Sequence, residues 1–487
     1  MENDNNPELN RRRFLSGTAT LAVSGALQGV LATPSSASEK DQGYRKAGTD
    51  YDVIIIGGGF AGVTAAREMG LTGFRTLLLE ARPRLGGLTF TSKFAGQKVE
   101  LGGTWVHWLQ PHIWSEMQRY GLGVSESPVS EPTGAVLIRE DGSRKEYPPA
   151  EMMMAMAEGF ESFCYDAAIH FPRPFQPLLS DSVRELDRLS MLDRLNELKL
   201  PAEQKELVSG LCAALVGLDL EKAGLSGILK SFACAGWNFP AFMDTQSHYK
   251  IKGGTIALIN AMIEDSGAEV QMATPVEAIR QTGNKVLITT DEEKTISASA
   301  VIITAPLNTY QDIEFEPALS AEKQKIATGT RQSQGVKIYA HIKQDIGQFM
   351  GVGAHQRAIN VLQTEHHGKG GTIMVGLGAN RELLDINDNE MVAAEINAFL
   401  PEVEVLGSTG YDWLYDPYSR GTWPAYRVGE MSTELETLQK PDGRLFFAGG
   451  ATANGWHEWM DGAIESGLRA GREVRTLLEH SQPGATF

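Results

Sequence analysis

The chain has 487 residues, a hydrophobic content of 42% and a formal net charge of −17 at pH 7. This length accommodates two domains of ordinary size, and the hydrophobic fraction is typical of a globular protein. The negative charge disfavours nucleic acid and anionic membrane surfaces as partners, because both repel an acidic protein. The three cysteines, Cys164, Cys212 and Cys234, match no metal-site or disulfide spacing, so we expect buried free thiols and no metal.

Residues 1–37 have the pattern of an export signal. The run NRRRFL at 10–15 is followed by a mildly apolar stretch at 17–30 and by small residues at 35–37. This pattern resembles a twin-arginine signal, which directs folded proteins to the bacterial periplasm. The alternative is a basic disordered tail, and the stretch is too short and glycine-rich to span a bilayer. A polar linker is expected at 38–50.

The strongest motif lies at 51–87. An apolar run at 52–56 predicts a strand, and three glycines follow in G-x-G-x-x-G spacing before a helical pattern: Gly57, Gly59 and Gly62. A second apolar run at 76–79 ends in Glu80, which is placed to bind a ribose hydroxyl. The helix N-terminus would face a pyrophosphate. The motif therefore predicts a dinucleotide site; the alternative is a tight structural turn.

The remaining predicted elements are helices and strands in alternating groups. Helical periodicity is present at 113–121, at 150–169 and across 181–232. Apolar or alternating runs predict strands at 269–279, 285–289, 300–304, 337–342, 371–377 and 445–448. A last helix is predicted at 461–478.

The chain thus begins and ends with strand–glycine–helix units, which predicts an α/β, two-domain protein. A Rossmann-like dinucleotide domain would be assembled from three separated segments, 51–112, 249–305 and 431–487. The substrate domain would comprise a mainly helical insertion at 113–248 and a mixed segment at 306–430.

Four segments resemble a known family. They are LLLEARPRLGG at 77–87, ELGGTWVHW at 100–108, DPYSRGTW at 416–423 and FFAGGATANGWHEWMDGAIESG at 446–467. Their order and spacing resemble the FAD-dependent amine oxidases of the monoamine oxidase type over nearly all of 51–478. The runs at 105–122 and 231–255 are most similar to the bacterial enzymes that oxidise nicotine and pseudooxynicotine.

The resemblance implies a set of FAD-binding positions. The pyrophosphate and adenosine ribose would be held by the first glycines and Glu80, with Arg84 as a nearby cation. Val276 would meet adenine through its backbone. The flavin and ribityl chain would be approached by Gly86, Gly87, Gly103, Thr104, Trp105, Gly449, Gly450, Met460 and Ala463. The helix that begins near Met460 would stabilise negative charge on the reduced flavin.

Three positions depart from the family pattern. Leu88 stands where the family usually has arginine, and Ala451 stands where it usually has an acid, so two polar contacts to the cofactor are missing. Thr422 replaces the cysteine of covalently flavinylated members. We therefore expect FAD to be bound non-covalently.

The resemblance also implies the catalytic residues. Trp423 and Trp459 match the aromatic cage that confines the amine beside the flavin. Lys337 matches the lysine that holds a water at flavin N5, and a lysine in an apolar strand is unusual. The alternatives are two core tryptophans and a lysine that reaches solvent. The pocket walls are expected to include some of Trp105, Trp108, Leu215, Trp237, Phe239 and Thr372.

The predicted function is therefore oxidation of a C–N bond in nicotine or a related pyridine-alkaloid amine, with hydride transfer to FAD and hydrolysis of the resulting iminium. The alternatives are a flavin amine oxidase of another substrate, namely another monoamine, a polyamine or an amino acid, and a catalytically weakened FAD-binding protein. Oxygen or a periplasmic cytochrome would accept the electrons, and the resemblance implies a homodimer.

Overall fold

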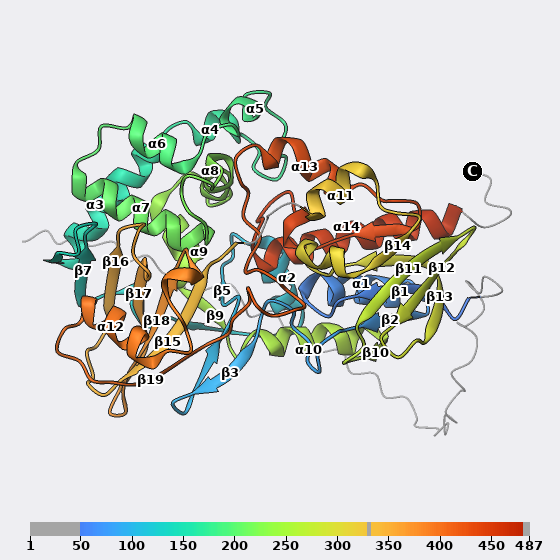
Figure 1. Ribbon diagram of the computed structural model, residues 1–487, viewed down its shortest axis with the longest axis horizontal. Helices are drawn as coiled ribbons and strands as arrows, with labels where there is room; N and C mark the ends of the chain where they lie inside the picture. The colour runs from blue at the N-terminus through green and yellow to red at the C-terminus, as the bar shows by residue number, and fades with distance from the viewer. Residues whose placement is uncertain (1–48, 329–332, 481–487) are drawn as a thin grey trace, which may run out of the picture. The chain divides into compact units, whose positions relative to one another are not determined.

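The computed structural model describes residues 49–328 and 333–480 (Figure 1). The predicted export signal at 1–37 lies outside these residues, as does almost all of the predicted linker at 38–50. No helix in the described ranges is long and apolar enough to cross a membrane.

One sheet of eight strands gathers segments from distant parts of the chain. Its central strands β1 (Tyr51–Ile56), β2 (Thr76–Leu79), β13 (Thr295–Ile303) and β20 (Leu445–Phe447) run parallel. The outer strands are β10 (Glu269–Gln271), β11 (Val276–Thr282), β12 (Lys285–Thr290) and β14 (Glu314–Glu316). The strands predicted at 52–56, 76–79, 300–304 and 445–448 are therefore confirmed.

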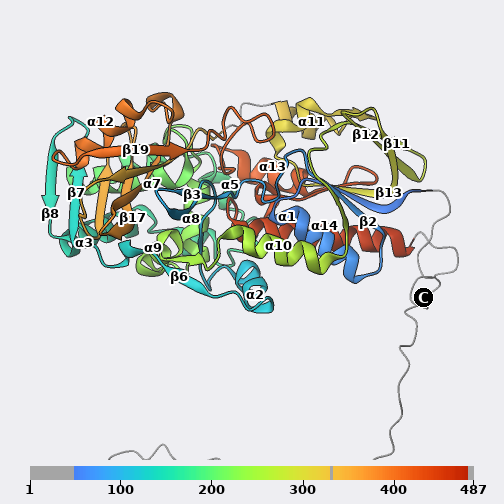
Figure 2. The same ribbon diagram turned by 90° about the horizontal axis from the view of Figure 1, so that it is seen from below.

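Three helices cover one face of this sheet: α1 (Phe60–Leu71), α10 (Thr255–Ser266) and α14 (Met460–His480) (Figure 2). Successive side chains of a strand point to opposite faces. Val53 and Ile55 accordingly join the core beneath these helices, while Ile54 and Ile56 join the core on the other face. Burial on both faces explains why β1 reads as a continuous apolar run rather than an alternating one.

A second sheet has seven strands and is mainly antiparallel. Its order is β19 (Val405–Gly410), β15 (Val336–Ile342), β18 (Gly371–Gly378), β17 (Val361–Gly368), β16 (Phe349–Gly353), β7 (Gly134–Ile138) and β8 (Arg144–Tyr147). Helix α12 (Asn389–Phe399) packs its buried side chains on one face. The strands predicted at 337–342 and 371–377 are confirmed; β7 and β8 come from the segment expected to be mainly helical.

The remaining helices pack mostly around a second core that holds all three free cysteines. Their bounds are α2 (Pro111–Arg119), α3 (Pro149–Phe163), α4 (Ala167–His170), α5 (Val183–Leu186), α6 (Met191–Glu197), α7 (Ala202–Val216), α8 (Leu225–Cys234), α9 (Phe239–Ser247), α11 (Ala321–Thr328) and α13 (Glu430–Gln439). Small sheets are formed by β3 (Thr91–Phe94) with β4 (Gln97–Glu100), and by β5 (Trp105–Val106), β9 (Tyr249–Ile251) and β6 (Val124–Glu126). The predicted burial of the cysteines as free thiols is confirmed.

The strand predicted at 269–279 is two strands. The backbone of Ala273 turns into the left-handed region at φ 51°, and Thr274 N donates to Glu80 O at 3.0 Å. β10 pairs with β2, whereas β11 pairs with β12 and β14. The break arises because the chain changes pairing partner at this point, and it brings Val276 to the end of β2.

Candidate active site

The glycine turn after β1 is fixed by close backbone approach. Gly57 has φ +107°, and a Cβ on Gly62 would lie 1.9 Å from the oxygen of Gly57. Gly59 caps α1 without a side-chain hydrogen bond, and the first turn of the helix carries no acid. The N-terminus of α1 therefore keeps backbone N–H groups and positive potential for an anionic ligand.

Glu80 lies at the end of β2 with only 3% of its surface exposed. Its two carboxylate oxygens accept hydrogen bonds from Gly58 N at 2.7 Å and Arg82 N at 2.8 Å. A carboxylate has about four lone-pair positions, so each oxygen retains capacity for a hydroxyl donor. The turn glycines and the acid are thus held together as the motif predicts.

Two further segments close around this turn. Gly86 N donates to Gly58 O at 2.9 Å, which joins the loop after β2 to the first glycine turn. Gly449 follows β20, and a Cβ there would meet nothing within 4 Å. Its N–H donates to Ser466 Oγ of α14 at 2.8 Å. Segments from both ends of the chain therefore form one wall of the site.

A cavity of about 560 Å³ runs from the glycine turn to the helical region. Residues predicted for the cofactor and the amine line it together: Gly57, Gly59, Glu80, Gly86, Gly87, Gly103, Thr104, Trp105, Leu215, Val276, Lys337, Trp423, Gly449, Gly450, Trp459, Met460 and Ala463. Leu88, Ala451 and Thr422, which depart from the family pattern, line it as well.

Lys337 projects from β15 into this cavity and is buried. Its Nζ donates to Gly102 O at 2.9 Å and to Thr104 Oγ1, and it lies 4.8 Å from the Trp105 ring centroid. Burial lowers the pKa of Lys337 to about 8, although the carboxylates of Glu365 and Glu100 oppose the shift. The lysine does not reach bulk solvent, and it is charged below about pH 8 and neutral above it.

The two predicted cage tryptophans are each fixed by a neighbouring element. Trp423 Nε1 donates to Leu215 O at 2.8 Å, and its ring packs so closely that a Cβ on Gly335 would lie 2.8 Å away. Trp459 packs edge-on against the fully buried Trp456, with 5.7 Å between ring centroids. Both residues line the cavity, and Trp459 also packs against the helical core.

Four predicted wall residues do not line this cavity. Thr372 lies at the far end of β18, where its hydroxyl donates to Gln344 O; Leu377, which pairs with Lys337, lines the cavity instead. Phe239 is packed in the helical core. Trp108 and Trp237 are 49% and 40% exposed, and Trp108 packs against His107 with 3.8 Å between the centroids of the tilted rings.

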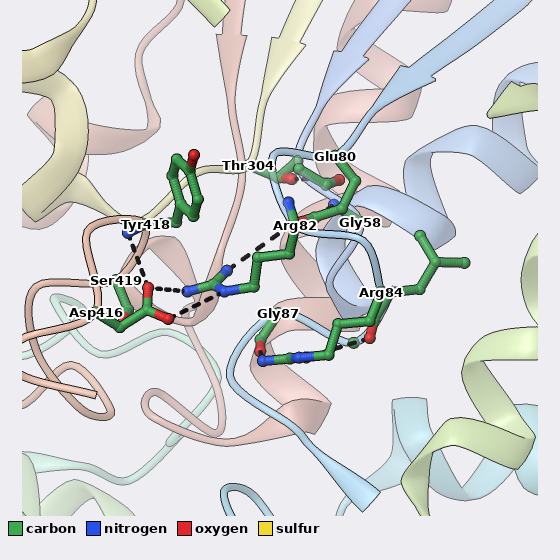
Figure 3. A network of polar contacts seen from close by, with 12 residues as sticks. Gly58, Glu80, Arg82, Arg84, Gly87, Thr304, Asp416, Tyr418 and Ser419 are labelled. Atoms are coloured by element: carbon green, nitrogen blue, oxygen red, sulfur yellow. Dashed lines mark hydrogen bonds and ion pairs between the residues drawn. The ribbon is translucent and has the colours of Figure 1, made fainter. Parts of the chain in front are cut away.

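Two predicted cofactor residues do not line the cavity: Gly62, in the first turn of α1, and Arg84, in the loop after β2. Gly62 permits the close turn, and Arg84 donates to the carbonyl oxygens of its own loop, including Gly87 O at 3.2 Å. The neighbouring Arg82 pairs with Asp416 through Nη2–Oδ1 at 2.5 Å (Figure 3). Burial alone would raise the pKa of Asp416, but hydrogen bonds from Arg82 and Tyr411 hold it below its usual range.

Several cavity residues were missed from the sequence, notably Arg82, Phe242, Tyr426 and Glu458. Glu458 immediately precedes Trp459 and has a left-handed backbone at φ 77°. The sequence pattern around Glu458 does not indicate a cavity residue, and its left-handed backbone is visible only in the structure.

The residues present fit a flavin dinucleotide. Gly449 lines the cavity, and since a Cβ there would meet nothing, the backbone is left open to a flat ligand. Trp105 Nε1 is a buried donor with no partner in the described residues, so it is available to a bound group. In the described residues, no group of three or more His, Cys, Asp or Glu side chains is arranged to hold a metal ion.

The fold and this cavity are typical of a class of protein, the dinucleotide-binding enzymes whose reaction chamber adjoins the nucleotide site. The family model described as "Flavin containing amine oxidoreductase" matches residues 60–475, and the chain belongs to that family. It is an enzyme of the flavin amine oxidoreductase class with FAD as its cofactor.

Two curated relatives match almost the whole chain. Nicotine dehydrogenase of Pseudomonas putida is 48% identical over 475 residues, covering 97% of this chain and 98% of the relative. Pseudooxynicotine dehydrogenase of a Pseudomonas species is 42% identical over 486 residues, covering 98% of each.

Among solved structures, a variant of putrescine oxidase superposes with a TM-score of 0.76 at 20% identity, covering 88% of this chain and 99% of that one. Cyclohexylamine oxidase of Brevibacterium oxydans superposes with a TM-score of 0.74 at 18% identity, covering 88% and 100%. At these identities the likeness establishes the fold alone, and it confirms the predicted α/β architecture.

Proposed function

We propose that this chain oxidises a C–N bond of nicotine or a closely related pyridine-alkaloid amine such as pseudooxynicotine. The observation that carries the proposal is the 48% identity to nicotine dehydrogenase over nearly the full length. An aromatic-lined cavity suits a flat pyridine that carries a secondary or tertiary amine.

The residues of the chain orient the amine and control its surroundings. Bound FAD supplies the hydride acceptor, and the oxidised substrate is an iminium that water hydrolyses. Trp423 and Trp459 confine the amine by shape and by their π-faces. Lys337, fixed by Gly102 and Thr104, holds a water and places a positive charge at this end of the cavity.

Anaerobic mixing of the purified holoenzyme with amines tests the substrate. We expect nicotine or pseudooxynicotine to bleach the flavin absorbance, and to do so faster than benzylamine, putrescine and common L-amino acids. If neither pyridine alkaloid bleaches the flavin while another amine does, the substrate assignment is wrong.

The roles of the aromatic rings are tested by Trp423→Ala. We expect this variant to slow flavin reduction by about tenfold or more, because the amine loses its confinement, while FAD content stays close to that of the wild type. Trp114→Ala, on α2 and outside the cavity lining, is the control and should retain the wild-type reduction rate. A variant that loses FAD but keeps its reduction rate per flavin would contradict the cage role of Trp423.

We further propose that a twin-arginine signal exports the folded protein to the periplasm, that oxygen or a periplasmic cytochrome reoxidises the flavin, and that the enzyme is a homodimer. The sequence NRRRFL at 10–15 and the family resemblance support these proposals. Fractionation of cells that express the wild type and an Arg11→Lys, Arg12→Lys, Arg13→Lys variant tests the export. We expect flavin amine oxidoreductase activity in the periplasm only for the wild type.

A further inference from the structure

The indole of Trp423 is held along one edge by two glycines from different elements. Gly217 caps α7, and Gly335 lies immediately before β15. A Cβ on Gly335 would lie 2.8 Å from Cη2 of the indole, and a Cβ on Gly217 would lie 3.1 Å from Cζ2. The same edge carries Nε1, which donates to Leu215 O at 2.8 Å. Gly217 and Gly335 thus form a slot without side chains, and we call it the glycine slot.

The two glycines lack a side chain for different reasons. Gly217 has φ 60° and ψ 31°, the left-handed conformation that favours glycine at the end of a helix whatever its neighbours are. Gly335 lies outside the positive-φ region, so its backbone would accept a residue with a Cβ. The close approach of Trp423, and of Thr422 Oγ1 at 3.1 Å, is therefore what excludes a side chain at Gly335.

Hydrogen bonds fix the backbone around the glycine slot. Gln334 N donates to Gly217 O at 2.8 Å, and Thr422 N donates to Ser333 O at 3.2 Å. Ser333 Oγ also donates to Trp423 O. These bonds join the end of α7, the segment before β15 and the segment that carries the indole. A side chain in the slot would therefore displace the indole rather than the backbone, and the space next to the indole is the cavity that Trp423 lines.

The position of the indole sets the room that is left for the amine. Trp423 and Trp459, the two predicted cage residues, line the same cavity. Apolar pockets discriminate between ligands by steric fit, and one methylene group more or less changes the rate by about 10- to 200-fold. A displaced indole would narrow the cavity, and the loss should be largest for an amine that is bulky at its nitrogen.

We propose that Gly335 determines the bulk of the amine that the enzyme accepts. By leaving the glycine slot free of side chains, it lets Trp423 stand back from the cavity and admits amines whose nitrogen belongs to a ring. Gly335 acts through Trp423 and is therefore a positioning residue. This inference rests on the proposed amine-oxidising function and extends it to the shape of the substrate around its nitrogen.

The test compares the wild type with Gly335→Ala in anaerobic flavin reduction, with rates expressed per bound flavin. It uses two amines that both reduce the wild-type flavin, one with its nitrogen in a ring and one with its nitrogen on an open chain. Nicotine and pseudooxynicotine are such a pair, as are N-methylpyrrolidine and N-methylbutylamine. We expect Gly335→Ala to lower the reduction rate constant divided by Kd about tenfold more for the cyclic amine than for the open-chain amine.

A double-mutant cycle shows whether the effect passes through the indole. Trp423→Phe removes Cζ2 and Cη2, the two atoms that the slot contacts, and keeps an aromatic ring. In the Trp423→Phe background, Gly335→Ala should change the ratio between the two amines by about twofold or less, because the contact is already absent. A Gly335→Ala chain that folds only in that background would support the same contact.

A matched control is Gly407→Ala on β19, the strand that pairs with β15. A Cβ on Gly407 would meet nothing within 4 Å, so this variant should keep the wild-type ratio between the two amines. The inference is overturned if Gly335→Ala slows both amines equally, if its effect is the same in the Trp423→Phe background, or if Gly335→Ala fails to fold in both backgrounds.

The substrate assignment and this inference fail in different ways. Any cyclic and open-chain pair that reduces the flavin serves for the measurement, so an incorrect assignment to pyridine alkaloids leaves the test of Gly335 intact. A protein whose flavin no amine reduces would overturn both.

Discussion

Lys337 carries its charge where water is almost excluded. Its ammonium group is held by one carbonyl and one hydroxyl, and neither carries a charge. Because burial lowers its pKa to about 8, the group is charged below that pH and neutral above it. The electrostatic field at this end of the cavity therefore changes as pH passes through about 8.

We expect the rate of flavin reoxidation to fall as pH rises through about 8, since the positive charge favours electron transfer to an acceptor. In Lys337→Met the rate should be lower, on the order of tenfold, and should lose this pH dependence. The reduced enzyme is mixed with oxygen or with a cytochrome, without substrate, so that titration of the amine does not contribute.

A second buried lysine provides the control. Lys323 also lines the cavity, packs 3.6 Å from the Phe447 ring centroid, and has a pKa lowered by burial to about 8. Lys323→Met should retain the pH dependence of reoxidation. If it loses the dependence and Lys337→Met keeps it, the titrating group has been misassigned.

Single residues could be predicted from the sequence where a short motif or an unusual side chain marks them. The first glycines and Glu80 follow from the spacing of one turn, and Lys337 from an unusual lysine in a strand matched to a family position. Thr372 could not be placed in the same way, because its distance from Lys337 depends on the register of β15 and β18. Glu458 was not predicted from the sequence; it lines the cavity next to Trp459 and has a left-handed backbone.

At the scale of elements, the Arg82–Asp416 ion pair joins the loop after β2 to the segment that carries Thr422 and Trp423. Both side chains are less than 10% exposed, and Tyr411 also donates to Asp416. Glu80 and Arg82 share one loop (Figure 3). The ion pair therefore connects the predicted ribose ligand Glu80 with the segment that carries the predicted cage residue Trp423. The loop after β2 and the segment before Trp423 are thus tied to each other by a buried ion pair.

We expect Asp416→Asn to lower the free energy of unfolding by about 3 kcal/mol, because Arg82 keeps a buried charge without its partner. Flavin reduction should also slow, since Trp423 is less firmly held. Urea denaturation and anaerobic stopped-flow measure the two effects. Glu479→Gln breaks the exposed pair with Arg475 and should change stability by about 0.5 kcal/mol or less; equal losses in both variants would contradict a special role for the buried pair.

The pH dependence of this ion pair follows from the lowered pKa of Asp416. A carboxyl with a depressed folded pKa stabilises the fold fully above its unfolded pKa of about 4. That contribution is lost as pH falls through the lower folded value. The wild type should therefore have a larger free energy of unfolding than Asp416→Asn at neutral pH, and this difference should disappear only in acid.

Strands with strong apolar runs could be predicted from the sequence. Strands whose existence or bounds depend on hydrogen bonding to a neighbouring strand could not. β1, β20 and the second half of β13, from Ala300, are buried on both faces and read as continuous apolar segments. The AVLI run in β7 was a usable signal, but its partner β8 is mostly exposed and charged. The break between β10 and β11 depends on a change of neighbouring strand, which no local pattern records. The predicted domain boundaries stay predictions.

At the scale of the whole molecule, FAD should be held by many weak contacts and no covalent bond. Thr422 lines the cavity, its hydroxyl lies 2.8 Å from Ser333 Oγ, and a hydroxyl does not form the thioether that a cysteine can. We expect denaturation followed by filtration to release all the flavin, and we expect the melting temperature of the apoprotein to rise with added FAD. A ligand at a hundredfold excess over its Kd stabilises by about 2.7 kcal/mol.

FMN is the matched control for this measurement, because it lacks the adenosine whose ribose Glu80 is placed to bind. It should raise the melting temperature much less than FAD does. Flavin that stays with the precipitated polypeptide, or equal shifts with FMN and FAD, would contradict this account of the cofactor site.

The position of β20 beside β13, and of α14 against α1, has a consequence for biosynthesis. A ribosome delivers the N-terminal half of the nucleotide site long before the strand and helix that complete it. Until residues 445–480 emerge, the sheet lacks a strand and the cavity lacks the wall that carries Gly449, Trp459 and Met460. The cofactor site is therefore completed only once residues 445–480 have been made, and a chain that stops before α14 leaves the ribosome without a finished cofactor site.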